Sequence, residues 1–143
     1  MRKALLLLPL LFVLGCKAPA PDTPGAPLPS DPPKVTVLKY TQLGAAANNT
    51  AAHTLAALCP VPPAVPSMDA AACSTTAVYI RTAARTFDQI AMEASSADAW
   101  PTMRVKIAGI GAASAISVVV PNPTLQAQIN AVVGLVTQIL GVK

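Results

Sequence analysis

The sequence predicts an all-α fold, a small bundle of three or four helices formed by residues 34–143. Two observations predict it. Apolar side chains recur at intervals of three and four residues over long stretches, which is the spacing of one helix face. Prolines and short polar runs separate these stretches, where helices end. Of the 143 residues, 53% are hydrophobic and 11% charged, which suits one compact domain and argues against a disordered chain.

The first helix is expected to end at Leu58, because Pro60 cannot continue it. Residues 35–40 have a strand-like composition, whereas residues 42–58 are rich in alanine, the best helix former. Near-helical spacing of the apolar side chains joins the two parts, so we expect one helix with a frayed start. His53 and Asn49 are four residues apart and are expected to share an exposed face, which favours a surface histidine over a general base.

The second helix shows the clearest pattern. Ser67 is expected to cap it, with Asp69 in the first turn. One apolar stripe follows helical spacing and consists of Tyr79, Ile80, Ala83, Phe87, Ile90, Ala91 and Ala94. The opposite, solvated face carries Arg81, Arg85, Asp88 and Met92, of which Arg85 and Asp88 have the spacing of a weak surface pair.

A third helix is expected from about Thr102 to Val119, preceded by a capping-box spacing from Ser95 to Asp98. Its expected core positions are Met103, Ile107, Ile110, Ala113, Ile116 and Val120. Residues 116–120 are rich in β-branched side chains and form a strand in the alternative interpretation. Asn122 and Pro123 then predict a capped fourth helix that stops at Gly141, with an apolar stripe formed by Leu125, Ile129, Val132, Val133, Val136, Ile139 and Leu140.

Residues 17–33, which follow Cys16, contain seven prolines, at positions 19, 21, 24, 27, 29, 32 and 33. That density excludes a regular helix or strand, so we interpret residues 16–33 as an extended linker. At about 3.1 Å per residue its reach is roughly 50 Å. A spacer is the favoured role, and a ligand for a proline-binding module is the alternative.

Residues 1–15 are expected to be a signal peptide, because they have a basic start and an apolar stretch too short to span a bilayer. Val13-Leu14-Gly15-Cys16 resembles the lipobox of bacterial lipoproteins. The resemblance implies cleavage after Gly15, a thioether-linked diacylglycerol on Cys16 and acylation of the new amine. Multiple acyl chains hold a protein stably on a membrane, which one chain does only marginally. An ordinary signal peptide with a chance cysteine and an uncleaved anchor are the alternatives.

The cysteine count then becomes even. With Cys16 committed to lipid, Cys59 and Cys73 remain, and an even pair in an oxidising compartment predicts a disulfide. The bridge would contribute roughly 3 kcal/mol by closing the loop between them. A catalytic or metal-binding thiolate pair is the alternative, but His53 is the one histidine and the spacing is not that of a zinc site, so no metal is expected.

Residues 107–142 carry no charged side chain, which raises the possibility of a membrane hairpin. The first arm, residues 107–120, is about 21 Å long as a helix and too short to cross a bilayer core of roughly 30 Å. The second arm carries Gln126, Gln128, Asn130 and Gln138, which are costly in lipid. A buried hairpin, or one packed against a second copy, is therefore favoured, and insertion into lipid after a trigger stays open.

Neither an enzyme nor a cofactor is expected. Phosphate-binding and dinucleotide-binding glycine motifs and a nucleophile elbow are absent from the sequence, and the carboxylates of Asp69, Asp88, Glu93 and Asp98 are scattered. Removing Arg2 and Lys3 with the signal peptide lowers the formal net charge from +4 to +2. A nucleic-acid partner is therefore not expected, because no basic patch remains.

Together these features predict a lipoprotein of the cell envelope with a non-catalytic structural or protein-interaction role. It would be bound to the membrane through Cys16, and its partner would be an envelope protein or another copy of itself. Lys17 is not the aspartate of inner-membrane retention, so in a Gram-negative host the chain would face the periplasm from the outer membrane.

The layout also resembles small lipoproteins of tailed phages and prophages, which implies lysis, as in spanins, or superinfection exclusion as alternatives. A folded domain with a disulfide after the proline run departs from the spanin pattern.

Overall fold

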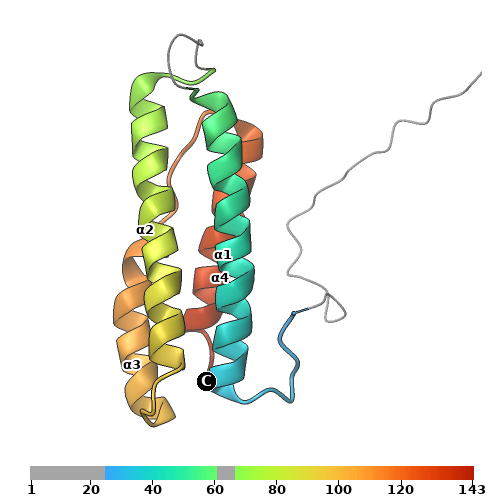
Figure 1. The fold of residues 1–143 in the computed structure, drawn as a ribbon, viewed down its shortest axis with the longest axis vertical. Coiled ribbons are helices and arrows are strands. Elements are labelled where there is room, and N and C mark those ends of the chain that lie inside the picture. The colour runs from blue at the N-terminus through green and yellow to red at the C-terminus, as the bar shows by residue number, and fades with distance from the viewer. Residues whose placement is uncertain (1–24, 61–66) are drawn as a thin grey trace, which may run out of the picture.

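The computed structural model describes residues 25–60 and 67–143, and within them every regular element is helical (Figure 1). The elements are α1 (Pro33–Leu58), α2 (Ala70–Ala94), α3 (Trp100–Gly111), a 3₁₀ turn η1 (Ala112–Ser114) and α4 (Pro123–Leu140). The predicted all-α bundle of three or four helices is therefore confirmed, with four α-helices in the described part of the chain.

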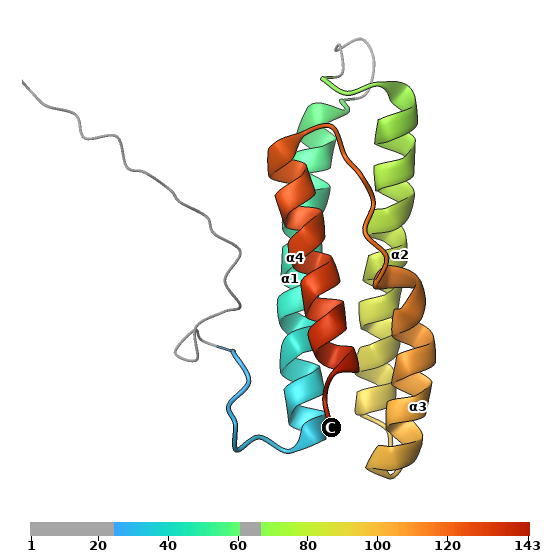
Figure 2. The ribbon, with the colours of Figure 1, turned by 180° about the vertical axis from the view of Figure 1, so that it is seen from behind.

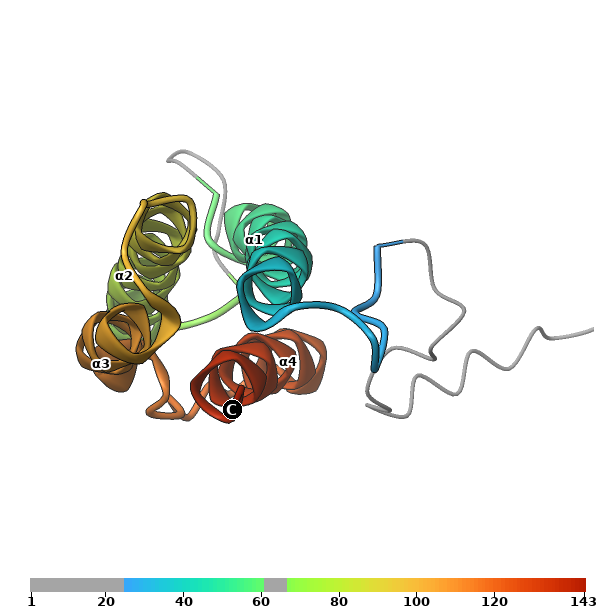
Figure 3. The same ribbon diagram turned by 90° about the horizontal axis from the view of Figure 1, so that it is seen from below.

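Successive helices run in opposite directions along one axis (Figure 1). Viewed along that axis, α1 packs against both α2 and α4, and α3 lies against α2 (Figure 3). The third helix covers only part of the height of the bundle. After η1, an extended segment, residues 117–120, rises beside the other helices towards the start of α4 (Figure 2).

The strand-like composition of residues 35–40 does not prevent helix formation, because α1 begins already at Pro33. A proline is well suited to the first turn of a helix, where its missing N–H is not needed. Val37 is fully buried, and Thr41 one turn later donates its hydroxyl proton to the Val37 carbonyl at 2.7 Å. Packing against the neighbouring helices thus outweighs local strand preference.

The second helix is capped by Asp69 and not by Ser67, so that expectation was wrong. The Asp69 carboxylate accepts a hydrogen bond from the Ala72 amide at 2.8 Å. Ser67 instead donates its backbone N–H to the Leu58 carbonyl at 2.8 Å, which links the α1–α2 connection to the end of α1. The predicted apolar stripe is buried from Tyr79 to Ala94, except that Ala91 is partly exposed.

The third helix departs most from prediction. It begins at Trp100 without a side-chain cap, and Ser95 ends α2, so the expected capping box from Ser95 to Asp98 does not form. The helix also stops at Gly111, well short of Val119, and Ile116 is 67% exposed. The alternative strand over residues 116–120 is not formed either, since these residues have no ladder partner.

The hydroxyl of Ser114 explains why the helix ends where it does. Ser114 is buried in η1, where its hydroxyl contacts the Thr86 hydroxyl at 2.8 Å and its carbonyl accepts a hydrogen bond from Tyr79 at 3.2 Å. Two polar groups of α2 therefore fix the chain at this point. Gly109 and Gly111 lower the helix propensity of the preceding turn.

The fourth helix agrees with prediction. The Asn122 side chain accepts a hydrogen bond from the Leu125 amide at 3.0 Å, and Gly141 follows the last helical residue. The core that the four helices enclose includes the following largely or fully buried side chains: Val37, Phe87, Ile90, Met103, Leu125, Ile129, Val132, Val136 and Ile139. The Phe87 ring of α2 lies against the backbone of Gly44 in α1, so the two helices pack very closely at this point.

Candidate functional site

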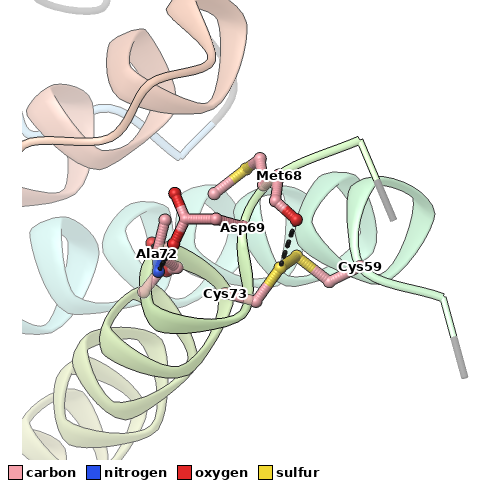
Figure 4. The surroundings of a disulfide bond; sticks show 6 residues. Cys59, Met68, Asp69, Ala72 and Cys73 are labelled. Atoms are coloured by element: carbon pink, nitrogen blue, oxygen red, sulfur yellow. Dashed lines mark hydrogen bonds between the residues drawn. A yellow bond between two sulfur atoms is a disulfide. The ribbon is translucent and has the colours of Figure 1, made fainter. Parts of the chain in front are cut away.

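A disulfide joins Cys59 at the end of α1 to Cys73 in the first turn of α2 (Figure 4). The two Cα atoms are 6.0 Å apart, and the expected bridge is present. The Cys73 Sγ lies 3.8 Å from the Met68 carbonyl oxygen, drawn as a dashed line in Figure 4. An oxidised sulfur carries no proton, so this is a packing contact. Cys16, the predicted lipidation site, lies outside the described residues and stays a prediction.

Next to the disulfide the surface between α1 and α2 is hollowed into two adjoining cavities of about 430 and 310 Å³. Both are lined by Ala52, Ile80 and Arg81, so they form one continuous depression, which we call the α1–α2 trough. Its remaining lining residues are Ala45, Asn48, Asn49, Leu55, Ala56, Cys59, Cys73, Ser74, Ala77, Ala84 and Asp88. Most of these are small, so the helix backbones are accessible to a partner that approaches closely.

One polar side chain in the trough is incompletely satisfied. Asn48 is only 4% exposed, and its Nδ2 donates to the Ile80 carbonyl at 3.0 Å. Its Oδ1 is buried and has no hydrogen-bond partner within the described chain. A buried acceptor without a donor costs free energy, so the Asn48 Oδ1 atom lowers the stability of the single bundle.

The ion pairs of the described residues gather near the other end of the bundle. Lys39 pairs with Asp31 at 2.8 Å, and Lys106 contacts Glu93 at 3.3 Å and also pairs with Asp98. The hydrogen bond from Lys39 lowers the pKa of Asp31, and that from Lys106 lowers the pKa of Asp98. These acids are thereby held in their charged form.

Two charged side chains beside the trough take no part in these pairs. Arg81 and Asp88 are exposed on α2, and neither belongs to an ion pair of the described part of the chain. Arg85, also exposed, is not paired with Asp88, so the surface pair allowed by the sequence does not form. The trough therefore has one free positive and one free negative group on its α2 side.

The extended segment is held by two amide side chains of α4. Gln126 accepts a hydrogen bond from the Val120 amide at 2.6 Å and donates to the Val118 carbonyl at 3.0 Å. Asn130 accepts from Gln126 at 2.9 Å and from Ser117 at 3.2 Å. Gln126 thus satisfies two backbone groups that a helix would have paired internally, and Asn130 holds the Gln126 amide in place.

The titratable residues considered from the sequence are not brought together. His53 and Asn49 are exposed on α1, Asp69 caps α2, and Glu93 and Asp98 contact Lys106. Within residues 25–60 and 67–143 there is no cluster of side chains that could hold a metal ion. The feature of the described surface that suits binding is the α1–α2 trough. Sequence reasoning missed the trough, because its signal, alanines recurring on one face of two helices, is also that of an ordinary helix.

None of the helices in the described part of the chain is long and apolar enough to cross a membrane. Comparisons of the chain with protein-family models, curated proteins and solved structures found no match. The functional argument therefore depends on the residues and geometry of this chain itself.

Proposed function

We propose that this protein is a lipid-anchored lipoprotein of the cell envelope whose helical domain has a non-catalytic, protein-interaction role. The observation that carries the proposal is the disulfide between Cys59 and Cys73. Bridges of this kind persist in oxidising compartments, which are reached by export. The bridge also leaves Cys16, in its lipobox-like sequence, as the one cysteine available for a lipid.

The arrangement of the domain suits such an anchor. The chain enters the bundle at the start of α1, and the disulfide lies at the other end of this helix (Figure 1). With 26 residues α1 is about 39 Å long, so the bridge and the trough beside it lie away from the point where the chain enters. A membrane anchor on Cys16 would leave this end of the domain accessible to other proteins.

The surface chemistry supports binding over catalysis. The trough has small side chains, a buried acceptor without a donor and two free charges. The carboxylates of Asp31, Asp98 and Glu93 are occupied in ion pairs, and that of Asp69 in a helix cap. The phage-type alternatives, lysis and superinfection exclusion, stay predictions from the layout of the sequence.

The proposal is tested by replacing Cys16 with serine in the full chain and separating membranes from soluble envelope contents. We expect the unchanged chain in the membrane fraction and Cys16→Ser to lose lipid labelling. A matched Cys59→Ser/Cys73→Ser variant should keep the lipid label, because these residues have no part in anchoring. Equal lipid labelling of the Cys16→Ser variant and the unchanged chain would refute the anchor, and envelope rupture on expression would favour the lysis alternative.

A further inference from the structure

We propose that the α1–α2 trough is the interface for a second copy of this chain, with the two α2 helices antiparallel about a two-fold axis that passes close to Ala84. This inference goes beyond the anchoring role and does not depend on it. Two observations carry it: the charges of Arg81 and Asp88, which line the trough without forming an ion pair in the described residues, and the small residues around them.

The charges determine the kind of partner. Arg81 and Asp88 both line the trough and are seven residues apart, about 10 Å along the helix, which is too far for them to pair with each other. Ala84 lies between them, also in the trough. In an antiparallel pair centred there, Arg81 of each copy meets Asp88 of the other. A two-fold interface uses the same patch twice, so a surface with one charge of each sign about its centre is self-complementary.

The lining permits the close contact that such a pair requires. Ala77 and Ala84 on α2, and Ala45 and Ala52 on α1, recur at seven-residue intervals and present only methyl groups to a partner. Helices approach closely where side chains are small.

Charge reversal tests the arrangement in the full mature chain, purified in detergent and followed by sedimentation equilibrium. Arg81→Asp and Asp88→Arg each place like charges at both ends of the interface, and each should weaken dimerisation about tenfold or more. The double variant Arg81→Asp/Asp88→Arg restores both pairs and should dimerise like the unchanged chain. A mixture of the two single variants should form a heterodimer, because each then meets its opposite. Arg104→Asp, exposed on α3 and remote from the trough lining, is the control.

Cross-linking locates the axis independently. The variant Ala84→Cys should form a disulfide between two copies, whereas Ala108→Cys, at an exposed position on α3, should not. Circular dichroism confirms that each variant is folded. A chain that stays monomeric at every concentration would overturn the proposal, as would a dimer whose strength is unchanged by Arg81→Asp. Recovery in the double variant together with heterodimer formation in the mixture would establish it.

Discussion

The contact between Gly44 and Phe87 makes a sharp prediction about two chemically identical substitutions. A Cβ atom added at Gly44 would lie 2.3 Å from both Cε1 and Cζ of the Phe87 ring. Phe87 is 1% exposed, so its ring has little room to withdraw. At Gly134, in the middle of α4, an added Cβ would meet nothing within 4 Å. The two glycines thus share a helical setting and differ in what faces them.

The magnitudes follow from two opposing effects. Alanine is more favourable than glycine within a helix by about 1 kcal/mol. Overfilling a packed core costs about 1 to 3 kcal/mol, and a contact as short as this one belongs at the upper end. We therefore expect Gly44→Ala to lower the free energy of unfolding by about 1 to 2 kcal/mol, whereas Gly134→Ala raises it by up to about 1 kcal/mol.

Urea denaturation of the full chain, monitored by circular dichroism, measures both changes, and an unchanged denaturant slope shows that the unfolded state is not altered. Combining Gly44→Ala with Phe87→Leu should cost less than the sum of the two single changes, because the smaller side chain relieves the clash. If Gly44→Ala stabilised the protein as much as Gly134→Ala, the close packing of α1 on α2 described above would be wrong.

Three further predictions concern the bridge, a helix cap and a buried tyrosine. Replacing Cys59 and Cys73 by serine should lower the free energy of unfolding by roughly 3 kcal/mol, measured by urea denaturation. If the same midpoint persisted without the bridge, its structural role would be refuted. Asn122→Ala removes the acceptor of the Leu125 amide and should cost about 1 kcal/mol, whereas no loss would exclude this residue as the cap of α4. Burial raises the pKa of Tyr79 from 10.0 to about 12, so stability present below pH 10 should fall as the pH rises towards 12. Absorbance titration should show Tyr79 ionising near 12, Tyr79→Phe should remove the alkaline loss, and a normal Tyr79 titration would contradict its burial.

The sequence predicted those parts of the fold in which a single periodic pattern dominates. The stripes of α2 and α4 and the cap at Asn122 are recognisable because apolar spacing and capping chemistry are local properties. The start of α1 was also expected to be helical in spite of its β-branched residues, although the regular helix begins at Pro33 and no frayed start is present.

The rest depended on contacts between distant residues. The end of α3 is fixed by Tyr79 and Thr86 of α2, which bond to Ser114, and no local pattern indicates that encounter. The extended segment after it is stabilised by Gln126, whose amide acts as a substitute for a neighbouring strand. Residues 102–119 have a helix-period pattern, but side-chain contacts from α2 and α4 hold the residues after Gly111 in other conformations.

The candidate site was predictable only in part. The pairing of Cys59 with Cys73 followed from counting cysteines once Cys16 was assigned to lipid. The trough depends on how α1 and α2 lie side by side, and the free acceptor of Asn48 depends on the depth at which that side chain is buried. Neither property can be deduced from spacing along one helix.

Intact-mass spectrometry of the protein extracted from membranes tests the central claim most directly. The account predicts a chain that begins at Cys16, carries diacylglycerol and an additional acyl group, and has no free thiol because Cys59 and Cys73 are bridged. A chain that retains residues 1–15 and shows an unmodified Cys16, or two titratable thiols in the helical domain, would contradict it.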